Sequence, residues 1–363
     1  MVEMQQWRVG IVGVGAIGTL AHLPGYRNAG AEVVAVADVA KGRAAEVADK
    51  FGIPASYENY REMLENEDLD VVSVCTPNAL HAEITVAALQ AGANVLCEKP
   101  MALTSAEATN MIKTSEDTGK GLSIAHTMRH RPEMEHIKEL ATSGAFGDIY
   151  HVKVSYLRRS GIPGYGSWFT NGDLAGGGAM MDIGCHVLDL GLWFMGHPRP
   201  TSVLAGTYAA FGPRAKGLGS WGADHYDPPA RFDVDDFSTA FVRFENGATL
   251  TVEASWVCHG SEGNRIQIFG TDGGVDFNPA AFGPDGALRF YGEDKDGFTQ
   301  QTLTVPEEKA ATGTGHDVLI ADWLCKLEAG EPPRVRPEEA AAVVQIIEGI
   351  YESADSGEEA RLD

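Results

Sequence analysis

The stretch VGIVGVGAIG, residues 9–18, decides the fold of the first part of the chain. Its apolar start predicts a buried strand, and three glycines then follow in the pattern G-x-G-x-x-G. Gly13 permits a tight turn, Gly15 lets the backbone approach a pyrophosphate, and Gly18 allows a helix to pack closely on the sheet. A helix that begins near Ala16 would attract the phosphates with its N-terminus. The predicted cofactor-binding residues of this turn are Gly13, Gly15, Ala16, Ile17 and Gly18.

Asp38 completes this pattern, because it lies twenty residues after Gly18 at the end of a second predicted strand, Glu32–Ala37. Its carboxylate would accept hydrogen bonds from ribose hydroxyls and repel a 2′-phosphate, which predicts NAD as the cofactor. Lys41 and Arg43 follow closely and could neutralise such a phosphate, so NADP stays as the alternative.

Short apolar runs alternate with helical patterns as far as residue 127. This alternation predicts an α/β Rossmann domain over residues 1–127, built on a doubly wound parallel sheet. A further predicted strand, Val71–Cys75, leads into a polar segment at its carboxyl end, where ligands bind in such sheets. The cofactor-binding candidates of this segment are Thr76, Pro77, Asn78 and His81. A turn with a capping asparagine is the structural alternative.

The pattern changes after that domain, and residues 128–363 predict an α+β substrate-binding and oligomerisation domain. Its strands begin with Ile149–Leu157, and most of them follow residue 202. Apolar and polar residues alternate over Thr249–Val257, which indicates a large, mostly antiparallel open sheet with one face covered. The last helices, Asp317–Leu327 and Pro337–Ser353, are candidates for packing back on the first domain. The polar tail, Asp355–Asp363, is expected to fray.

Composition excludes several classes of function. The formal net charge of -23 opposes binding to nucleic acid or to an anionic membrane surface. Five cysteines without a CxxC pair indicate reduced thiols in a cytoplasm. No apolar run approaches the roughly 20 residues of a membrane span. The segment Met1–Trp7 lacks the basic and apolar regions of a signal peptide. The predicted location is therefore cytoplasmic.

Two further stretches carry chemistry: GGGAMMDIGCH, residues 176–186, and Glu98-Lys99-Pro100. Asp182 and His186 stand four apart, so on a regular helix they share one face. A carboxylate beside an imidazole orients a general base, and Lys99 adds a cationic hydrogen-bond donor. Removal of a proton from an alcohol requires such a combination of a base, a group that orients it and a cation. A metal site is not predicted, because no third ligand stands at helical spacing.

These motifs together resemble the glucose–fructose oxidoreductase, inositol dehydrogenase and rhizopine-catabolism family, Gfo/Idh/MocA. The motifs that carry the resemblance are Gly13–Gly18 with Asp38, Thr76-Pro77-Asn78 with His81, Glu98-Lys99-Pro100, Gly144–Ile149 and Gly176–Asp189. The resemblance implies NAD(P)-dependent oxidation or reduction of sugars, polyols and their derivatives. It implies that Lys99, Asp182 and His186 are catalytic and that Glu98 neighbours the cofactor. It also implies an oligomer, a homodimer or homotetramer, formed through the open sheet.

Substrate contacts are expected from Lys99, Asp182 and His186, and from a second segment. Arg158, Tyr165 and Trp168 combine a cation with aromatic rings that could stack on a sugar, although a turn with solvated arginines is the alternative. A long irregular segment, residues 212–235, contains Trp221, His225, Tyr226 and Pro228-Pro229. It is expected to be a substrate lid, an arm that reaches a neighbouring subunit, or a tolerated insertion. The sequence does not identify the sugar.

The expected function is NAD(P)-dependent oxidation of a secondary or anomeric hydroxyl of a sugar, glycoside or inositol. His186 would take the hydroxyl proton while Lys99 stabilises the developing alkoxide, and which of the two is the formal base stays open. The alternatives are redox-assisted glycoside cleavage with bound NAD and a non-catalytic sugar or nucleotide sensor. An oxidoreductase that recycles a cofactor it never releases is a further variant.

Overall fold

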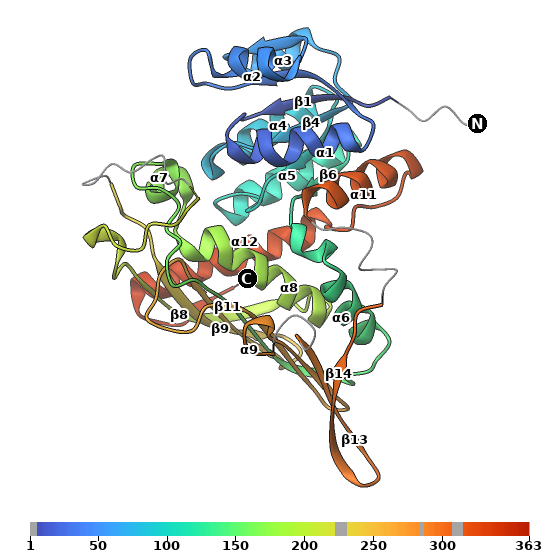
Figure 1. The fold of residues 1–363 in the computed structure, drawn as a ribbon, viewed down its shortest axis with the longest axis vertical. Coiled ribbons are helices and arrows are strands. Elements are labelled where there is room, and N and C mark those ends of the chain that lie inside the picture. The colour runs from blue at the N-terminus through green and yellow to red at the C-terminus, as the bar shows by residue number, and fades with distance from the viewer. Residues whose placement is uncertain (1–5, 222–230, 283–286, 307–314, 363) are drawn as a thin grey trace. The chain divides into compact units, whose positions relative to one another are not determined.

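The computed structural model describes residues 6–221, 231–282, 287–306 and 315–362 (Figure 1). The chain divides into two compact units, each described here by itself. Unit 1 comprises residues 1–131 and 312–341, and unit 2 comprises residues 132–311 and 342–363. Residues 312–341 of unit 1 thus follow most of unit 2 in the sequence. The sequence prediction placed a single boundary at residue 127.

Unit 1 contains a six-stranded sheet in the order β3-β2-β1-β4-β5-β6, and all of its paired strands are parallel. The strands are β1 (Arg8–Val12), β2 (Glu32–Ala37), β3 (Ala55–Tyr57), β4 (Val71–Val74), β5 (Asn94–Cys97) and β6 (Leu122–Ile124). The helices are α1 (Leu23–Asn28), α2 (Arg43–Phe51), α3 (Tyr60–Asn66), α4 (His81–Gln90), α5 (Ser105–Thr118) and α11 (His316–Ala329). Every residue of β4 is buried, as expected for a parallel strand covered on both faces. The predicted doubly wound sheet is confirmed.

Helix α11 brings the end of the chain into the core of unit 1. Ile320 and Trp323 on this helix belong to the same buried cluster as Val9 and Tyr26. A Cβ atom on Gly25 of α1 would lie 2.6 Å from Ile320 Cδ1, so glycine lets the two helices approach closely. The core of unit 1 therefore depends on a segment that follows most of unit 2 in the sequence.

Unit 2 contains a nine-stranded sheet in the order β14-β13-β12-β11-β7-β10-β9-β8-β15. Its strands are β7 (Ile149–Leu157), β8 (Pro200–Tyr208), β9 (Phe237–Phe244), β10 (Thr249–Ser255), β11 (Gly263–Gly270), β12 (Gly274–Phe277), β13 (Leu288–Asp294), β14 (Gly297–Leu303) and β15 (Ala360–Arg361). β7 and β10 are parallel, and the other neighbours are antiparallel. The predicted large, mostly antiparallel sheet is confirmed.

Helix α8 (Cys185–Met195) covers one face of this sheet, because a Cβ atom on Gly191 would meet Leu250 of β10 at 2.6 Å. The remaining helices of unit 2 are α6 (Pro132–Thr142), α7 (Gly172–Ala175), α9 (Pro279–Phe282) and the larger part of α12 (Pro337–Ser356), which begins in unit 1. The β10 residues Leu250, Val252 and Ala254 are buried, and Thr251 and Glu253 between them are half-buried. The alternation read from the sequence thus corresponds to a covered and an open face.

The end of the chain differs from the expectation. The tail does not fray as a whole, because α12 extends to Ser356 and β15 pairs with β8 at the sheet edge. Nearly all of β14 is exposed, so hydrophobic periodicity could not mark its start at Gly297.

The five cysteines form no disulfide bond, and Cys75, Cys97 and Cys185 are buried. Within the described residues, no helix combines the length and apolar character needed to cross a bilayer.

Candidate active site

The predicted cofactor residues of unit 1 lie at the carboxyl edge of its parallel sheet. Val12 of β1 is in register with Val74 of β4, and Val74 is in register with Cys97 of β5. The residues that follow these three strands therefore emerge side by side. The sheet order reverses between β1 and β4, and ligands bind at such a switch point in open α/β sheets.

The glycine-rich turn has the space that a pyrophosphate needs. Gly13 has a φ of +90°, and a Cβ atom there would lie 2.5 Å from the Cys75 carbonyl oxygen. On Gly18 a Cβ atom would lie 2.3 Å from the Gly13 carbonyl oxygen. A Cβ atom on Gly15 would meet no atom within 4 Å. Two of the glycines thus build the turn and the third leaves its outer side open, which fits a bound dinucleotide.

Gly15→Ala should therefore separate cofactor binding from stability. The protein itself has room for the new methyl group, so the melting temperature should stay within about 2 °C of the wild type. The methyl group would occupy the space that a pyrophosphate approaches, and NAD affinity should fall by about tenfold or more. Calorimetric titration with NAD and a thermal melt of the same sample measure the two effects. An unchanged affinity would contradict the assignment of this turn.

Asp38, directly after β2, is held in place by hydrogen bonds from the glycine-rich turn and from its own loop. Its Oδ2 accepts the Val14 N–H at 3.0 Å, and its Oδ1 accepts the Ala40 N–H at 2.9 Å. Arg43 lies nearby, since its Nε donates to the Val14 carbonyl at 3.3 Å. Both the predicted ribose acceptor and the cation that favours the alternative cofactor therefore lie at this turn.

The segment after β4 makes a short 3₁₀ turn, Asn78–Leu80, before α4 begins at His81. Thr76 and Pro77 are half-buried, and Asn78 is buried. His81 is buried with its Nδ1 2.7 Å from the Pro100 carbonyl and its Nε2 2.9 Å from the Thr76 carbonyl. Burial lowers the pKa of His81, although both hydrogen bonds oppose this. His81 therefore ties the predicted cofactor loop to the segment that carries Lys99.

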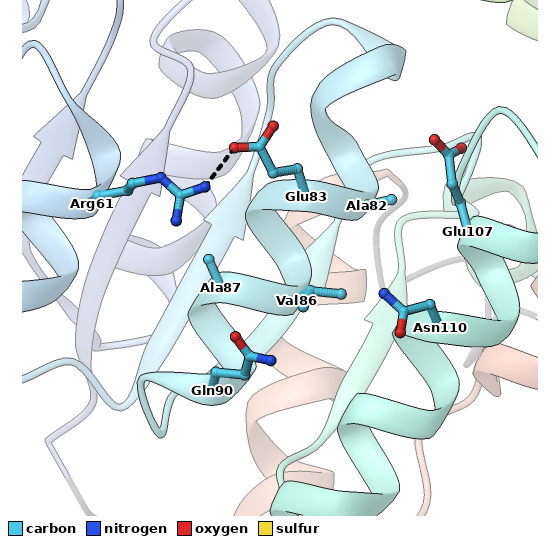
Figure 2. Close-up of a pocket in the computed structure, with 8 residues that line it drawn as sticks. All are labelled: Arg61, Ala82, Glu83, Val86, Ala87, Gln90, Glu107 and Asn110. Carbon is cyan, nitrogen blue, oxygen red and sulfur yellow. Dashed lines mark hydrogen bonds and ion pairs between the residues drawn. The ribbon is translucent and has the colours of Figure 1, made fainter.

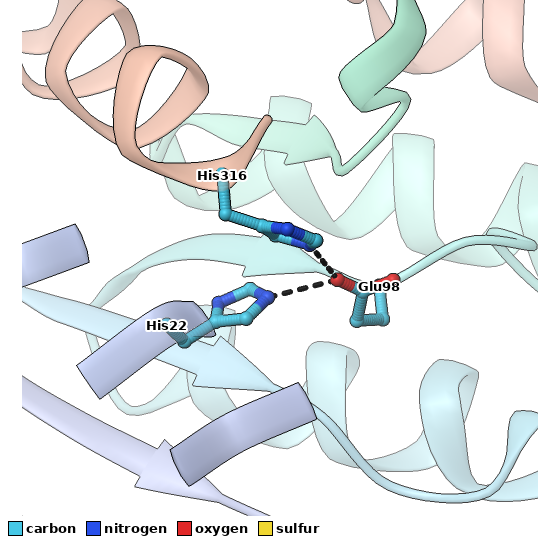
Figure 3. Close-up of side chains that lie close together, drawn as sticks. All are labelled: His22, Glu98 and His316. Carbon is cyan, nitrogen blue, oxygen red and sulfur yellow. Dashed lines mark hydrogen bonds and ion pairs between the residues drawn. The ribbon is translucent and has the colours of Figure 1, made fainter. Parts of the chain in front are cut away.

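Glu98 and Lys99 follow β5 directly. Glu98 is buried and contacts two histidines, His22 and His316, that the sequence analysis did not single out (Figure 3). Lys99 is half-buried, and its backbone N–H donates to Glu98 Oε2 at 3.2 Å. The lysine predicted to be catalytic thus belongs to the same edge of the sheet as the glycine-rich turn.

In unit 2, a buried carboxylate fixes the glycine run before the predicted catalytic residues. Asp235 accepts the backbone N–H groups of Gly178 at 2.7 Å and Met180 at 3.1 Å. It also accepts the hydroxyls of Ser238 at 2.6 Å and Tyr351 at 2.7 Å. Burial, followed by the charge of Asp235, raises the pKa of Tyr351 well above its usual value, so the phenol stays protonated and donates.

The same contacts explain why two of the glycines precede Ala179. A Cβ atom on Gly177 would lie 2.1 Å from the Tyr351 hydroxyl oxygen. On Gly178 it would lie 1.7 Å from the Asp235 carbonyl oxygen. The chain can lie against Asp235 and Tyr351 only without these side chains.

Asp182 and His186 lie on successive helical segments rather than on one regular α-helix. Met180–Gly184 forms a π-helical turn, and α8 begins at Cys185. The expectation of ordinary i, i+4 spacing was therefore wrong, and the wider turn changes the angle between the two residues. Such π-helical turns often occur at functional sites.

Asp182 has a partner that the sequence did not reveal. The indole Nε1 of the fully buried Trp256 donates to Asp182 Oδ2 at 2.8 Å. Trp256 follows β10, and the apolar alternation there marked it only as a core residue. The bond holds one carboxylate oxygen of Asp182, while Asp182 and His186 both stay half-buried.

The other residues predicted to bind substrate lie beyond β7. Arg158 Nη2 donates to the Tyr156 hydroxyl at 3.1 Å, and its guanidinium lies over that ring. Tyr165 is buried and donates its hydroxyl to the Lys216 carbonyl at 2.7 Å. Trp168 is half-buried and stacks on Phe169 with ring centroids 3.8 Å apart. Of the long segment, Trp221 is exposed, whereas His225, Tyr226 and Pro228-Pro229 lie outside the described residues.

A groove on unit 1 has a volume of about 350 Å³. Its lining residues are Arg61, Ala82, Glu83, Val86, Ala87, Gln90, Glu107 and Asn110 (Figure 2). Arg61 is already paired with Glu83, as Figure 2 shows. None of these lining residues was predicted to bind cofactor or substrate.

A doubly wound parallel sheet with a complete dinucleotide turn at its switch point is typical of a nicotinamide-dependent oxidoreductase. Residues 7–126 match the model of the oxidoreductase family with an NAD-binding Rossmann fold, Gfo/Idh/MocA. Residues 134–276 match the C-terminal domain of the same family. The chain belongs to this Gfo/Idh/MocA family and is an NAD(P)-dependent oxidoreductase.

Its relatives include several sugar dehydrogenases. The D-glucoside 3-dehydrogenase of Escherichia coli K12 is 32% identical over 98% of this chain and 97% of its own. The D-xylose 1-dehydrogenase (NADP(+)) 2 of Haloferax volcanii is 31% identical over 98% of this chain and 99% of its own. A structure of levoglucosan dehydrogenase in complex with NADH superposes with a TM-score of 0.83, at 27% identity, over 99% of this chain and 100% of that chain.

Proposed function

We propose that the protein oxidises a ring hydroxyl of a sugar, a glycoside or a related polyol, with NAD as the acceptor. The observation that carries the proposal is the complete dinucleotide turn at the carboxyl edge of the unit 1 sheet, where Lys99 also follows β5. The resemblance to the family implies that Lys99, Asp182 and His186 are the catalytic residues. Relatives that act on a D-glucoside, on D-xylose and on levoglucosan span nearly all or most of this chain. They support a pyranose or a polyol of similar size as the substrate class.

The proposed mechanism assigns one task to each side chain. The bound nicotinamide supplies the acceptor for the hydride. His186 takes the proton of the reacting hydroxyl, and the Lys99 ammonium donates a hydrogen bond to the oxygen as negative charge develops on it. Asp182, held by Trp256, orients the substrate through a hydroxyl or orients His186.

Arg158, Tyr165 and Trp168 remain candidates for the specificity of the site. The support for Arg158 and Trp168 is that both are half-buried beside aromatic rings that offer flat apolar faces to a sugar. The hydroxyl of Tyr165 already donates a hydrogen bond to the Lys216 carbonyl. Tyr165 would therefore contribute through its ring or through the position of its loop.

Nicotinamide reduction with a substrate panel tests the proposal. Purified protein would be mixed with NAD or NADP and with aldoses, β-glucosides, 1,6-anhydro sugars and inositols, and the absorbance of reduced cofactor followed. NAD-dependent turnover on one of these classes is the expected result. Tight NAD binding without turnover on any of them would refute the proposal. If sugars were then released from glycosides, the function would be redox-assisted glycoside cleavage.

We expect NAD to be preferred over NADP because of Asp38. Asp38→Ser removes the charge that repels a 2′-phosphate and leaves Arg43 in place, so the ratio of kcat/KM for NADP to that for NAD should rise by about tenfold or more. Asp49→Ser, which removes an exposed carboxylate from α2, is the matched control. Steady-state kinetics with both cofactors measure the ratio. An equal rise in both variants would reflect net charge alone.

The open face of the unit 2 sheet supports a homodimer or a homotetramer. Leu204 of β8 is in register with Phe241 of β9, and Phe269 of β11 and Tyr291 of β13 both pair with Gly274 between them. These four side chains are 54%, 37%, 37% and 37% exposed. Exposed apolar side chains on a sheet are typical of a contact surface between protein chains. Sedimentation equilibrium should give twice or four times the chain mass, and Phe241→Glu should lower it. A monomeric wild type would contradict this assignment.

A further inference from the structure

Three side chains that are far apart in the sequence meet behind the proposed catalytic lysine. His22 ends the π-helical turn that follows the glycine-rich turn, Glu98 follows β5, and His316 begins α11. Figure 3 shows both imidazole rings converging on one carboxylate oxygen. The Nε2 atoms of His22 and His316 lie 2.8 Å and 2.7 Å from Glu98 Oε1. We call these three residues the Glu98 hub.

The donors and acceptors of the hub can be assigned from its chemistry. A carboxylate only accepts, so each histidine presents an Nε2–H to Glu98. The Nδ1 of His22 is then an acceptor, and the Ser73 hydroxyl donates to it at 2.6 Å. Tyr26 in turn donates its hydroxyl to Ser73 at 3.4 Å. The hub is therefore the end of an ordered chain of hydrogen bonds through the core of unit 1.

The charge state of the hub agrees with this order. Burial raises the pKa of Glu98, but the hydrogen bonds from His22 and His316 outweigh it, so the pKa lies well below its usual value. Burial lowers the pKa of His22, and the contact with Glu98 only partly opposes this. Glu98 is thus a buried carboxylate beside a neutral His22, and its charge is stabilised by two N–H donors.

The distances favour hydrogen bonding over metal binding. The ligands of a tetrahedral zinc ion lie about 2.0–2.1 Å from the metal and hence roughly 3.3 Å from each other. Both histidine–carboxylate separations in the hub are shorter, at hydrogen-bond length. Glu98 is therefore hydrogen-bonded directly to both imidazole rings.

The hub reaches Lys99 through the second oxygen of Glu98. Glu98 Oε2 accepts the Lys99 N–H at 3.2 Å, and on the other side His81 Nδ1 lies 2.7 Å from the Pro100 carbonyl. The backbone on both sides of the lysine is therefore fixed by side chains. His316 belongs to residues 312–341 of unit 1, so the support of the lysine segment includes a part of the chain that follows most of unit 2 in the sequence.

We propose that His22 and His316 are positioning residues, which hold Lys99 in its reactive place through Glu98. The proposal rests on the proposed function of Lys99. A catalytic group that is misplaced by about 1 Å can lower the rate by up to 100-fold. A fixed backbone at Lys99 therefore matters for turnover. Loss of the hub should lower kcat and leave NAD binding nearly unchanged.

His316→Ala and His316→Gln, with His136→Ala as the control, test this proposal. His136 lies on α6 and contacts Glu139, so its loss removes a histidine without touching the hub. His316→Ala should lower kcat by about tenfold or more while the Kd for NAD changes less than about threefold. The glutamine variant offers an N–H donor again and should recover part of kcat. An unchanged kcat in His316→Ala, or an equal loss in His136→Ala, would overturn the proposal.

Hydrogen exchange gives a readout that does not depend on turnover. The Lys99 amide donates to Glu98 Oε2, whereas the neighbouring Glu98 amide donates to the Val74 carbonyl within the sheet. His316→Ala should speed exchange at Lys99 by about tenfold or more and leave Glu98 protected. Unchanged exchange at Lys99 would refute the positioning role even if the protein had no sugar dehydrogenase activity. Stoichiometric zinc in the purified wild type that is lost in His316→Ala would also refute it.

Discussion

Lys99→Met should lower kcat by about 1,000-fold and leave the affinity for NAD within about threefold of the wild type. Lys99 is half-buried at the carboxyl edge of the parallel sheet, directly after Glu98. Its ammonium is assigned to stabilise the substrate oxygen, which becomes negative as the hydroxyl proton is removed and before the hydride leaves the carbon. Methionine keeps the length of the side chain and removes the charge and the donors, so the turn that binds the dinucleotide should be undisturbed.

Lys113→Met is the matched control for this variant. Lys113 is an exposed lysine on α5 that pairs with Asp117. Its replacement removes the same charge from the same unit and should change kcat by less than about twofold. Stopped-flow reduction of NAD under single-turnover conditions measures the hydride step in both variants. If Lys99→Met kept more than about a tenth of the wild-type rate, Lys99 would not be the group that stabilises the transition state.

Gly178→Ala should be the most destabilising small substitution in unit 2. Its Cβ atom would lie 1.7 Å from the Asp235 carbonyl oxygen, and that oxygen already accepts the Ala179 N–H at 3.0 Å. Both atoms of the clash belong to buried residues: Gly178 begins the segment that carries Asp182 and His186, and the carbonyl oxygen of Asp235 is backbone just before β9, so neither can shift without distorting the chain. We expect the free energy of unfolding to fall by about 3 kcal/mol or more and the melting temperature by roughly 10 °C.

Two comparisons make this prediction specific. Gly15→Ala places the same methyl group where no atom lies within 4 Å and should leave the melting temperature almost unchanged. Asp235→Ala combined with Gly178→Ala should not restore stability, because the clash is with the carbonyl oxygen of residue 235 and not with its side chain. Rescue by the double variant, or a stable Gly178→Ala protein, would show that this backbone contact is looser than described.

The sequence was most informative where a residue's role depends on its neighbours along the chain. The G-x-G-x-x-G turn and Asp38 are local, so the parallel sheet and its switch point could be predicted from them. Hydrophobic alternation over Thr249–Val257 located β10, which the structure places at Thr249–Ser255. The exposed strand β14 and the short strand β15 have no such pattern, because pairing with a neighbouring strand, rather than burial, defines them.

The supports of the site could not be predicted in the same way, because they come from distant parts of the chain. Trp256 reaches Asp182 across 74 residues, and His316 reaches Glu98 across 218. In the sequence Trp256 is one more apolar residue of a strand, and His316 is an isolated histidine before a helix. Only the fold shows that these side chains support residues that the motifs had already marked. The π-helical turn at Met180–Gly184 was missed because local propensity does not distinguish it from an α-helix.

Transfer of deuterium from sugar to cofactor is the most direct test of the proposed oxidation. Sugars and glycosides that carry deuterium on every ring carbon would be incubated with the protein and NAD, and the reduced cofactor analysed by mass spectrometry. We expect the wild type, and not Lys99→Met, to form NADH that carries one deuterium, in equal amount to an oxidised sugar. Cofactor that stays unlabelled and oxidised with the whole panel, despite tight binding of NAD, would contradict it.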